Sequence, residues 1–344
     1  MRVRHFALDT MPDSGGSSRY AFELSAHERK LGIDSKVIGF SKKQNTISRL
    51  IQNWKIRKSG IDVINIHYAG SFGILGIGLL PIKFSKIKVV STFHGPWHLE
   101  AKLAGKSKYK VLMAFLTQQS VTRASDSIIT LSRAFEFYAK KFSRKRIIVQ
   151  PPGIDSKITH PNHYNLKFKK DKISICIVRR LVPRMGVDLA ISALNLLPNK
   201  YELQIVGDGP ERDNLVAQTF KLGLDSRVKF LGHISDSDLE DVLLNSDLML
   251  VPSRDLEGYG MVVLEAYARC LAVIATPVQG LIESIPAQFH VWALAENVSD
   301  EAIAERVLKL KIESLPSHSE FQSVLSRNSW DAVFQRILKE YSAK

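Results

Sequence analysis

The sequence is poor in residues that build a covalent or metal framework. Its 344 residues include only two cysteines, Cys176 and Cys270, which lie far apart within apolar stretches. A disulfide scaffold or a structural zinc site needs more cysteines, or closely spaced Cys and His ligands. We therefore expect two reduced thiols in the core, no metal site, and the cytoplasm as the compartment.

Long hydrophobic runs are also missing. The longest apolar stretch, residues 72–82, is interrupted by Gly and Pro, and it falls short of the roughly 20 residues that a helix needs to cross a bilayer. The first 16 residues read as a short strand and a glycine turn, and they lack the apolar segment of a secretory signal. We expect neither a membrane span nor a signal peptide.

Acidic residues are scarce in the first half of the chain. The formal net charge is +14; the first 155 residues carry 26 Lys and Arg against 10 Asp and Glu, whereas the remainder carries 22 against 24. A basic half indicates an anionic partner: nucleic acid, an anionic lipid surface or a phosphorylated substrate. Because no nucleic-acid motif or interleaving of basic and aromatic residues is present, we do not expect nucleic-acid binding.

Short β-branched runs alternate with segments of helical periodicity along the whole chain. Helices are expected at 17–31, 238–245 and 261–270, and one long amphipathic helix over 321–341. Nearly all-apolar strands that alternate with helices are typical of parallel sheets covered on both faces. The pattern predicts an α/β protein with two doubly wound sheets of six strands, joined near 155–171. The expected strands are 3–8, 35–40, 62–68, 88–94, 127–132, 146–153, 173–180, 202–209, 228–233, 248–253, 272–277 and 290–295.

Two features of the first half suit ligand binding. Gly15 and Gly16 stand between the first strand and the first helix, where backbone N–H groups can approach an anion. The same glycines also fit a plain strand-to-helix turn, and the GxGxxG and P-loop patterns are not met. His94 and His67 each end a strand, and ligands of parallel α/β sheets gather beyond the carboxyl ends of strands. A lone histidine at such a position is more often structural, and this alternative stays open.

Arginines follow the first strand of the second half. Arg180 and Arg184 lie in the stretch IVRRLVPRMGVD, residues 177–188, and Gly186 lets the chain enter the next helix. Guanidinium groups donate paired hydrogen bonds, which suits a diphosphate. The alternative is a solvated basic loop.

Two carboxylates flank a glycine loop and a helix start in VPSRDLEGYGMVVLEAYA, residues 251–268. Glu257 stands on the loop beside Gly258 and Gly260, and Glu265 lies one turn into an apolar helix. A buried carboxylate is costly without a partner. A ribose diol would satisfy this requirement, and so would an internal salt bridge to a neighbouring strand.

These residues resemble the retaining glycosyltransferases of family 4, which have the GT-B fold. Glu257 and Glu265 look like that family's paired-glutamate signature, and residues 177–188 look like its phosphate-binding segment. The glycine loop at 15–16, His94 and the final stretch NSWDAVFQRILKEY are similar to its other features. The resemblance covers essentially the whole chain and is most specific in the second half.

The resemblance implies two Rossmann-like, doubly wound parallel-sheet domains facing a cleft. Residues 1–160 would bind the acceptor, 161–325 would bind the nucleotide sugar, and 326–344 would form a helix that crosses back to the N-terminal domain. His94 and Glu257 would be catalytic, with Glu257 stabilising the sugar. Catalysis would need neither a metal ion nor a cofactor. The donor-binding residues it implies are Gly15, Gly16, Arg180, Arg184, Gly258, Tyr259, Gly260, Met261, Val262 and Glu265.

One departure from the family pattern affects the phosphate-binding segment. The family usually has Lys five residues after the arginine, where this chain has Met185. The hypothesis is that Arg184 supplies the charge. The departure also keeps other interpretations open: a catalytically silent subunit with the same fold, or another GT-B enzyme such as a phosphorylase or a sugar-nucleotide epimerase.

The expected reaction transfers a hexosyl group from a UDP- or GDP-linked sugar to a glycan or lipid-linked acceptor, in surface polysaccharide or glycolipid synthesis. Residues 103–119 carry lysines beside an apolar face, as an interfacial helix does. They predict a peripheral contact with an anionic membrane surface. The alternative is a helix that packs on the core with its lysines in solvent.

Overall fold

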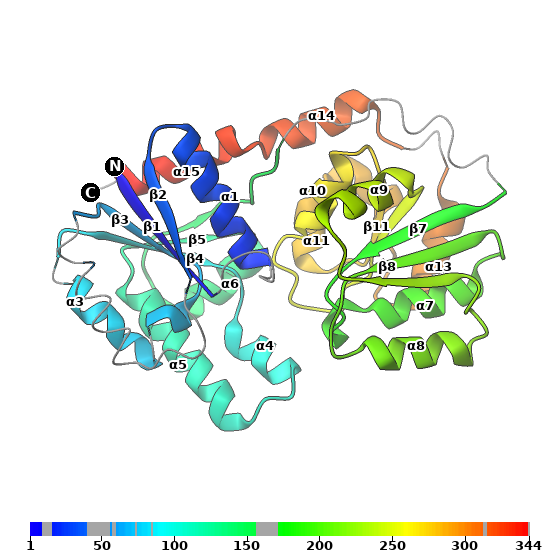
Figure 1. Cartoon of the computed structure of the whole chain (residues 1–344), viewed down its shortest axis with the longest axis horizontal. Coiled ribbons are helices and arrows are strands. Elements are labelled where there is room, and N and C mark those ends of the chain that lie inside the picture. Colours follow the sequence, from blue (N-terminus) through cyan, green and yellow to red (C-terminus); the bar gives the residue numbers. More distant parts are fainter. Residues whose placement is uncertain are drawn as a thin grey trace. The chain divides into compact units, whose positions relative to one another are not determined.

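The computed structural model describes residues 1–8, 16–39, 56, 60–72, 74–83, 85–155, 171–311 and 315–342 (Figure 1). The chain divides into two compact units. Unit 1 consists of Met1–Gly153 together with Asn328–Lys344, and unit 2 of Ile154–Arg327. Most of the expected joining segment, and Gly15 of the glycine loop, lie outside the described residues.

Unit 1 is built on a parallel sheet of six strands in the order β2-β1-β3-β4-β5-β6. All six strands expected in the first half are confirmed; the first two are shifted by one residue, and the other four are shorter than expected. The strands are β1 (Arg2–Ala7), β2 (Asp34–Gly39), β3 (Val63–Ile66), β4 (Lys88–Phe93), β5 (Ser127–Thr130) and β6 (Ile147–Val149). The helical elements are α1 (Gly16–Lys30), η1 (Ala69–Phe72), η2 (Ile74–Leu79), α3 (Leu80–Lys83), α4 (Trp97–Leu103), α5 (Lys108–Ala124), α6 (Arg133–Phe142) and α15 (Trp330–Ser342).

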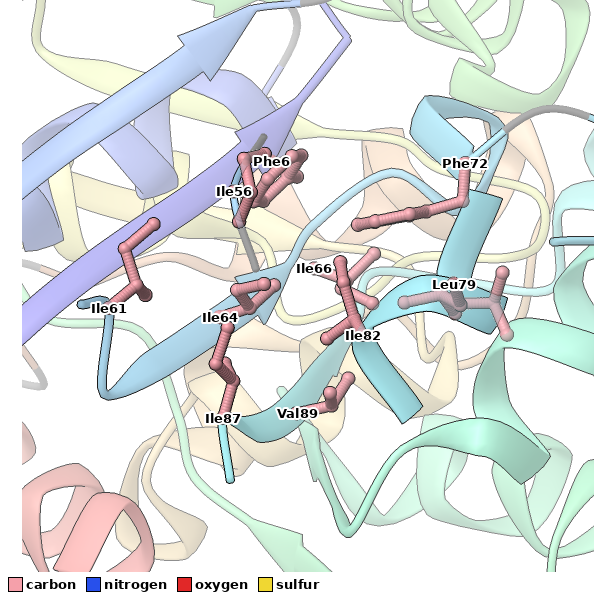
Figure 2. Packing of buried hydrophobic residues seen from close by; sticks show 11 residues of the cluster. Phe6, Ile56, Ile61, Ile64, Ile66, Phe72, Leu79, Ile82, Ile87 and Val89 are labelled. Carbon is pink, nitrogen blue, oxygen red and sulfur yellow. The ribbon is translucent and has the colours of Figure 1, made fainter. Parts of the chain in front are cut away.

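Side chains alternate between the two faces of this sheet, because successive strand residues point to opposite sides. Phe6, Ile64 and Ile66 enter a buried apolar cluster with residues of β4, α5 and the helical turns after β3 (Figure 2). Burying a side chain of this size contributes roughly 1.5–3 kcal/mol. His5 and Asn65 point to the opposite face, where they contact α1 and α15. The other cluster members are Ile56, Ile61, Phe72, Leu79, Ile82, Ile87, Val89 and Val121.

Unit 2 contains a parallel sheet of five strands in the order β11-β10-β7-β8-β9. The strands are β7 (Ile173–Val178), β8 (Tyr201–Val206), β9 (Val228–Gly232), β10 (Leu248–Val251) and β11 (Ala272–Ala275). The helical elements are η4 (Pro183–Met185), α7 (Val187–Leu196), α8 (Arg212–Lys221), α9 (Asp236–Asn245), α10 (Met261–Tyr267), α11 (Gln279–Ser284), η5 (Ala287–Phe289), α12 (His290–Ala293), α13 (Asp300–Lys309) and α14 (His318–Arg327).

The strand expected at 290–295 is wrong. Residues His290–Ala293 form helix α12, in which Trp292 is buried. Only Leu294 pairs with the sheet, through a single parallel bridge to Ala275. Periodicity cannot separate a strand from a buried helical turn in so short an apolar run. The second sheet therefore has five strands in the described part of the chain.

The single helix expected over 321–341 is also wrong, because it divides into α14 and α15. Ser329 Oγ accepts a hydrogen bond from the N–H of Ala332, as an N-cap residue does. The chain passes from unit 2 to unit 1 at this break. Both expected core thiols are confirmed as buried. Across the described ranges no helix has the length and hydropathy needed to span a bilayer.

Candidate functional site

Three polar side chains meet beyond the carboxyl ends of β7 and β10 in unit 2. Arg179 follows β7, and Ser253 and Glu257 follow β10. Arg179 Nη1 donates to Glu257 Oε2 at 2.7 Å, and Arg179 Nη2 donates to Ser253 Oγ at 2.8 Å. Ser253 Oγ in turn donates to Glu257 Oε2 at 3.0 Å, which closes the cluster. The Arg179 and Glu257 side chains are only 7% and 11% exposed, so the ion pair is largely shielded from water.

The charges around Glu257 keep it ionised. Burial alone would raise the pKa of this carboxyl, but the Arg179 guanidinium, with Arg184 and the Ser253 hydroxyl, outweighs burial and holds the pKa below its ordinary value. An ionised carboxylate accepts hydrogen bonds only. Glu257 is therefore a fixed negative group suited to hydroxyl or N–H donors of a ligand.

Arg184 belongs to the same cluster of loops. Its Nη1 donates to the carbonyl oxygen of Leu256 at 3.1 Å. The neighbouring Met185 places its Sδ 3.5 Å from Arg179 Nη1 and 3.9 Å from Arg184 Nη1. The position where the family usually has lysine is thus an uncharged thioether between two guanidinium groups.

Close backbone packing positions the turn after β7, which carries Arg184. Gly186 has a φ of +65°, and a Cβ atom built on it would lie 1.9 Å from the carbonyl oxygen of Pro252. The turn after β7 therefore presses directly on the end of β10, which brings Arg179 and Arg184 beside the Glu257 loop. Gly260, with a φ of +72°, precedes the first residue of α10. Left-handed backbone of this kind favours glycine.

The other residues expected at the site lie on this loop and on the first turns of α10. Tyr259 is buried, while Gly258, Met261, Val262 and Glu265 are partly exposed. Arg180 is exposed on the turn after β7. The structure thus brings Arg184 and Glu257 into one cluster, and Glu257 forms an ion pair with Arg179 within it.

Arg179 was missed by the sequence reasoning, which chose the adjacent Arg180. The two follow each other at a strand end, where the chain can turn either side chain inward. The signal that could have found Arg179 is Glu257 itself, since a buried carboxylate requires a cation nearby.

A row of buried polar side chains ends at His94 in unit 1. Glu28 Oε2 lies 2.8 Å from His5 Nε2, and His5 Nδ1 lies 3.0 Å from His67 Nε2. His67 Nδ1 lies 3.0 Å from His94 Nε2. His5 is on β1, and the other two histidines directly follow β3 and β4, which neighbour one another in the sheet. The sequence indicated His67 and His94, but not His5 or Glu28.

Burial keeps His67 and His94 uncharged. It lowers the pKa of His94 from 6.5 to about 3, and burial together with His5 and His94 holds the pKa of His67 well below its ordinary value. The Tyr20 ring packs edge-on against His94, with the ring centroids 5.3 Å apart. Gly16, the other residue expected here, is the exposed first residue of α1.

Comparisons with known proteins decide the family. Residues 161–328 match the model described as glycosyl transferases group 1, and residues 43–157 match that of glycosyltransferase family 4. An uncharacterized glycosyltransferase of Methanocaldococcus jannaschii is 30% identical over 314 residues, which cover 87% of this chain and 82% of the relative. The chain belongs to the glycosyl transferases group 1 family.

Glycosyltransferase family 4 is a retaining family whose members use nucleotide-sugar donors. The GPI3 subunit of phosphatidylinositol N-acetylglucosaminyltransferase from Saccharomyces cerevisiae is 28% identical over 181 residues. That match covers 51% of this glycosyltransferase and 40% of the yeast protein. A putative colanic acid biosynthesis glycosyltransferase of Salmonella typhimurium is 24% identical and matched over 64% of its length.

Solved structures show that this glycosyltransferase has the GT-B fold. HepE of Anabaena in complex with UDP-glucose has a TM-score of 0.78 at 19% identity, with 99% of each chain covered. Sucrose-phosphate synthase of Thermosynechococcus elongatus has a TM-score of 0.79 at 18% identity, covering 99% of this chain and 98% of that one.

Proposed function

We propose that this glycosyltransferase moves a hexosyl group from a UDP- or GDP-linked sugar to a glycan or lipid-linked acceptor. The observation that carries the proposal is the cluster of Arg179, Ser253, Arg184 and Glu257 beyond the sheet of unit 2. It combines a shielded anion with cations on one edge of the sheet, where ligands of such sheets bind. A relative of the same fold binds UDP-glucose.

Each part of the cluster suits one part of a nucleotide sugar. Arg180 and Arg184 would contact the diphosphate, and their charge would stabilise it as it leaves, so that no metal ion is required. Glu265 would accept hydrogen bonds from the ribose hydroxyls. Residues 258–262 would contribute backbone N–H groups. These roles follow the family resemblance.

Glu257 would act as a stabilising anion beside the transferred sugar, not as a proton acceptor or nucleophile. Its carboxylate already accepts from the Arg179 guanidinium at 2.7 Å and from Ser253 at 3.0 Å. Its lowered pKa makes it a weak base. Transfer with retention would then leave the acceptor proton to the departing phosphate oxygen.

Unit 1 would bind the acceptor, with His94 at the carboxyl edge of its sheet. We further propose that its surface contacts an anionic membrane. Leu103, Tyr109 and Leu112 are exposed, with Tyr109 70% exposed, and four exposed lysines are close to them in sequence: Lys102, Lys106, Lys108 and Lys110. Apolar side chains beside lysines bind the interface of anionic bilayers. The names of the yeast and Salmonella relatives refer to phosphatidylinositol and to colanic acid, which agrees with such acceptors.

A thermal-shift screen of nucleotide sugars tests the donor. A ligand raises the unfolding temperature according to its concentration and affinity, so we expect one UDP- or GDP-sugar to stand out. The same sugar should then be consumed in a hydrolysis or transfer assay, with retention at the anomeric carbon. Donor binding without turnover would instead support a catalytically silent subunit. No shift with any nucleotide sugar would contradict the proposal.

Liposome flotation tests the membrane contact separately. We expect the native protein to float with vesicles containing anionic lipid at low salt and to be released by added salt. The double variant Tyr109→Ser, Leu112→Ser should lose this binding, while Val216→Ser, an exposed apolar position on α8, should keep it. Equal flotation of both variants would contradict the assignment of this surface.

A further inference from the structure

Three buried side chains of unit 1 and the partly exposed His94 form one continuous row of hydrogen bonds. The row runs from Glu28 on α1 through His5 and His67 to His94. Glu28 and His5 are fully buried, and His67 is nearly so. Both ring nitrogens of His5 and of His67 are engaged by a neighbour in the row. Within the described part of the chain no residue hydrogen bonds Nδ1 of His94, which forms the open end of the row.

The chemistry of neutral imidazole links the four groups. A neutral ring has one nitrogen that donates and one that accepts. If Glu28 is ionised, it can only accept, so His5 must donate from Nε2. With the His5 ring neutral, its Nδ1 then accepts from His67 Nε2, and His67 Nδ1 accepts from His94 Nε2. All three rings carry the proton on Nε2, and His94 Nδ1 is left as an acceptor.

A proton on Glu28 would reverse every bond of the row. The carboxyl would donate to His5 Nε2, His5 Nδ1 would donate to His67, and His67 Nδ1 would donate to His94 Nε2. His94 would then present an N–H at Nδ1. As long as the three rings are neutral, the charge of this one carboxylate therefore decides whether the open end of the row accepts or donates a hydrogen bond.

We propose that Glu28 is a positioning residue whose carboxylate holds His5, His67 and His94 in the Nε2–H tautomer, so that His94 Nδ1 accepts a hydrogen bond from a substrate hydroxyl. The effect on transfer rests on the proposed function, in which His94 faces the acceptor. The tautomers themselves do not, because they are set within unit 1 without any substrate.

The packing around the row holds the geometry in place. Tyr20 packs against both His67 and His94, with centroid separations of 5.7 and 5.3 Å. Tyr341 of α15 accepts from Asn65 Nδ2 at 2.9 Å on the same face of the sheet. Burial raises the pKa of both tyrosines above the ordinary value, so they remain neutral. Glu28 is therefore the group in this environment whose charge can direct the row.

Nuclear magnetic resonance of protein with ¹⁵N-labelled histidine measures the tautomers directly. Long-range proton–nitrogen correlations distinguish a ring protonated on Nε2 from one protonated on Nδ1. Spectra of His5→Phe, His67→Phe and His94→Phe would assign the three rings. At neutral pH and without substrate, we expect all three to be Nε2–H in the native protein. A native His94 protonated on Nδ1 would overturn the proposal.

The variant Glu28→Gln tests the role of the charge. A carboxamide can accept or donate, so His94 should lose its single Nε2–H tautomer. In the transfer assay we expect kcat to fall roughly 10- to 100-fold, the range found when metal-bound histidines lose their orienting partner, with donor KM unchanged. Glu28→Asp, which keeps the carboxylate, should recover part of the rate. Glu23→Gln is the control, because Glu23 lies on the same helix and pairs with Arg19.

The outcomes separate this inference from the proposed function. An unchanged His94 spectrum in Glu28→Gln would overturn the inference whatever the activity. Absence of any transferase activity in the native protein would contradict the proposed function, while the tautomer measurement would still decide the role of Glu28.

Discussion

Adjacent arginines of this glycosyltransferase have different surroundings. Arg179 is buried against Glu257, whereas Arg180 is exposed. Removing one partner of a buried ion pair costs about 3–5 kcal/mol, because the other charge stays buried without compensation. Arg179→Leu should therefore destabilise unit 2 by roughly this amount. Arg180→Leu should leave stability within about 0.5 kcal/mol and weaken donor binding.

Chemical denaturation and donor titration of both variants would measure the contrast. The double variant Arg179→Leu, Glu257→Leu should recover stability relative to Arg179→Leu, since no uncompensated charge remains. Equal loss of stability in Arg179→Leu and Arg180→Leu would contradict the assignment of the ion pair.

Arg184 should supply the charge that Met185 lacks. Hydrogen bonds to charged groups contribute about 1.5–3 kcal/mol, so Arg184→Ala should raise the donor Kd by at least about tenfold. Introducing Met185→Lys into that variant should restore much of the affinity. Calorimetric titration with the donor found in the thermal-shift screen would measure both. An unchanged Kd in Arg184→Ala would end the compensation hypothesis.

The neutral histidines should make unit 1 sensitive to acid. The folded protein lowers the pKa of His94 from 6.5 to about 3, so below about pH 6.5 the unfolded chain binds more protons. The free energy of unfolding should therefore fall as the pH decreases from 6.5 toward 3. Denaturation at neutral pH and near pH 5, compared with His94→Asn, would measure it. An equally steep decline in His94→Asn would contradict this source.

Sequence reasoning at this scale could name residue types but not their partners. His94, Arg184 and Glu257 were indicated because chemistry-bearing side chains at strand ends face one edge of a sheet. Glu28 could not be found in this way, because its partner His5 lies 23 residues away on another element. Only the fold brings the two together.

At the scale of elements, a backbone contact places the turn after β7. A Cβ on Gly186 would lie 1.9 Å from Pro252 O, and its φ is +65°. Gly223 has the same φ but no atom within 4 Å of its added Cβ. Gly223→Ala should cost about 1–2 kcal/mol from backbone strain alone. Gly186→Ala should cost distinctly more and also weaken donor binding, because the loop that carries Arg184 must move.

Unfolding and donor titration of the two glycine variants would separate strain from displacement. Equal destabilisation with intact donor affinity would show that the contact with Pro252 does not position the site. The sequence indicated a turn at Gly186, but it could not show which neighbouring strand the turn would meet.

The strands were predicted better than two elements near the end of the chain. All eleven strands of the described residues correspond to expected runs. β-branched residues favour strands, and helical segments mark where each run ends. Residues 290–295 failed because a run of this length fits a buried helical turn equally well. The break between α14 and α15 was missed because the apolar stripe continues through Ser329, whose capping hydrogen bond ends the periodicity locally.

At the scale of the whole molecule, the last helix does not belong to the unit that precedes it in the sequence. Residues 328–342 follow unit 2 in sequence but belong to unit 1 (Figure 1). There the rings of Trp330 and Tyr20 pack with their centroids 5.5 Å apart. Glu340 Oε1 pairs with Arg146 Nη2 at 2.9 Å. The sequence predicted two sheets from the number of strands. The assignment of the last helix to the first sheet came from family resemblance, because no local pattern specifies so distant a partner.

A chain ending at Arg327 should therefore lose stability in unit 1, although the deletion adjoins unit 2. Removing α15 exposes Val333, Phe334 and Ile337, which are buried in unit 1, and each contributes roughly 1.5–3 kcal/mol. Scanning calorimetry should show a lowered or missing transition for unit 1. Nucleotide-sugar binding by unit 2 should persist. Gln335→Ala, at an exposed position of α15, is the control and should leave both transitions in place. Loss of donor binding with an intact unit 1 transition would show instead that α15 supports unit 2.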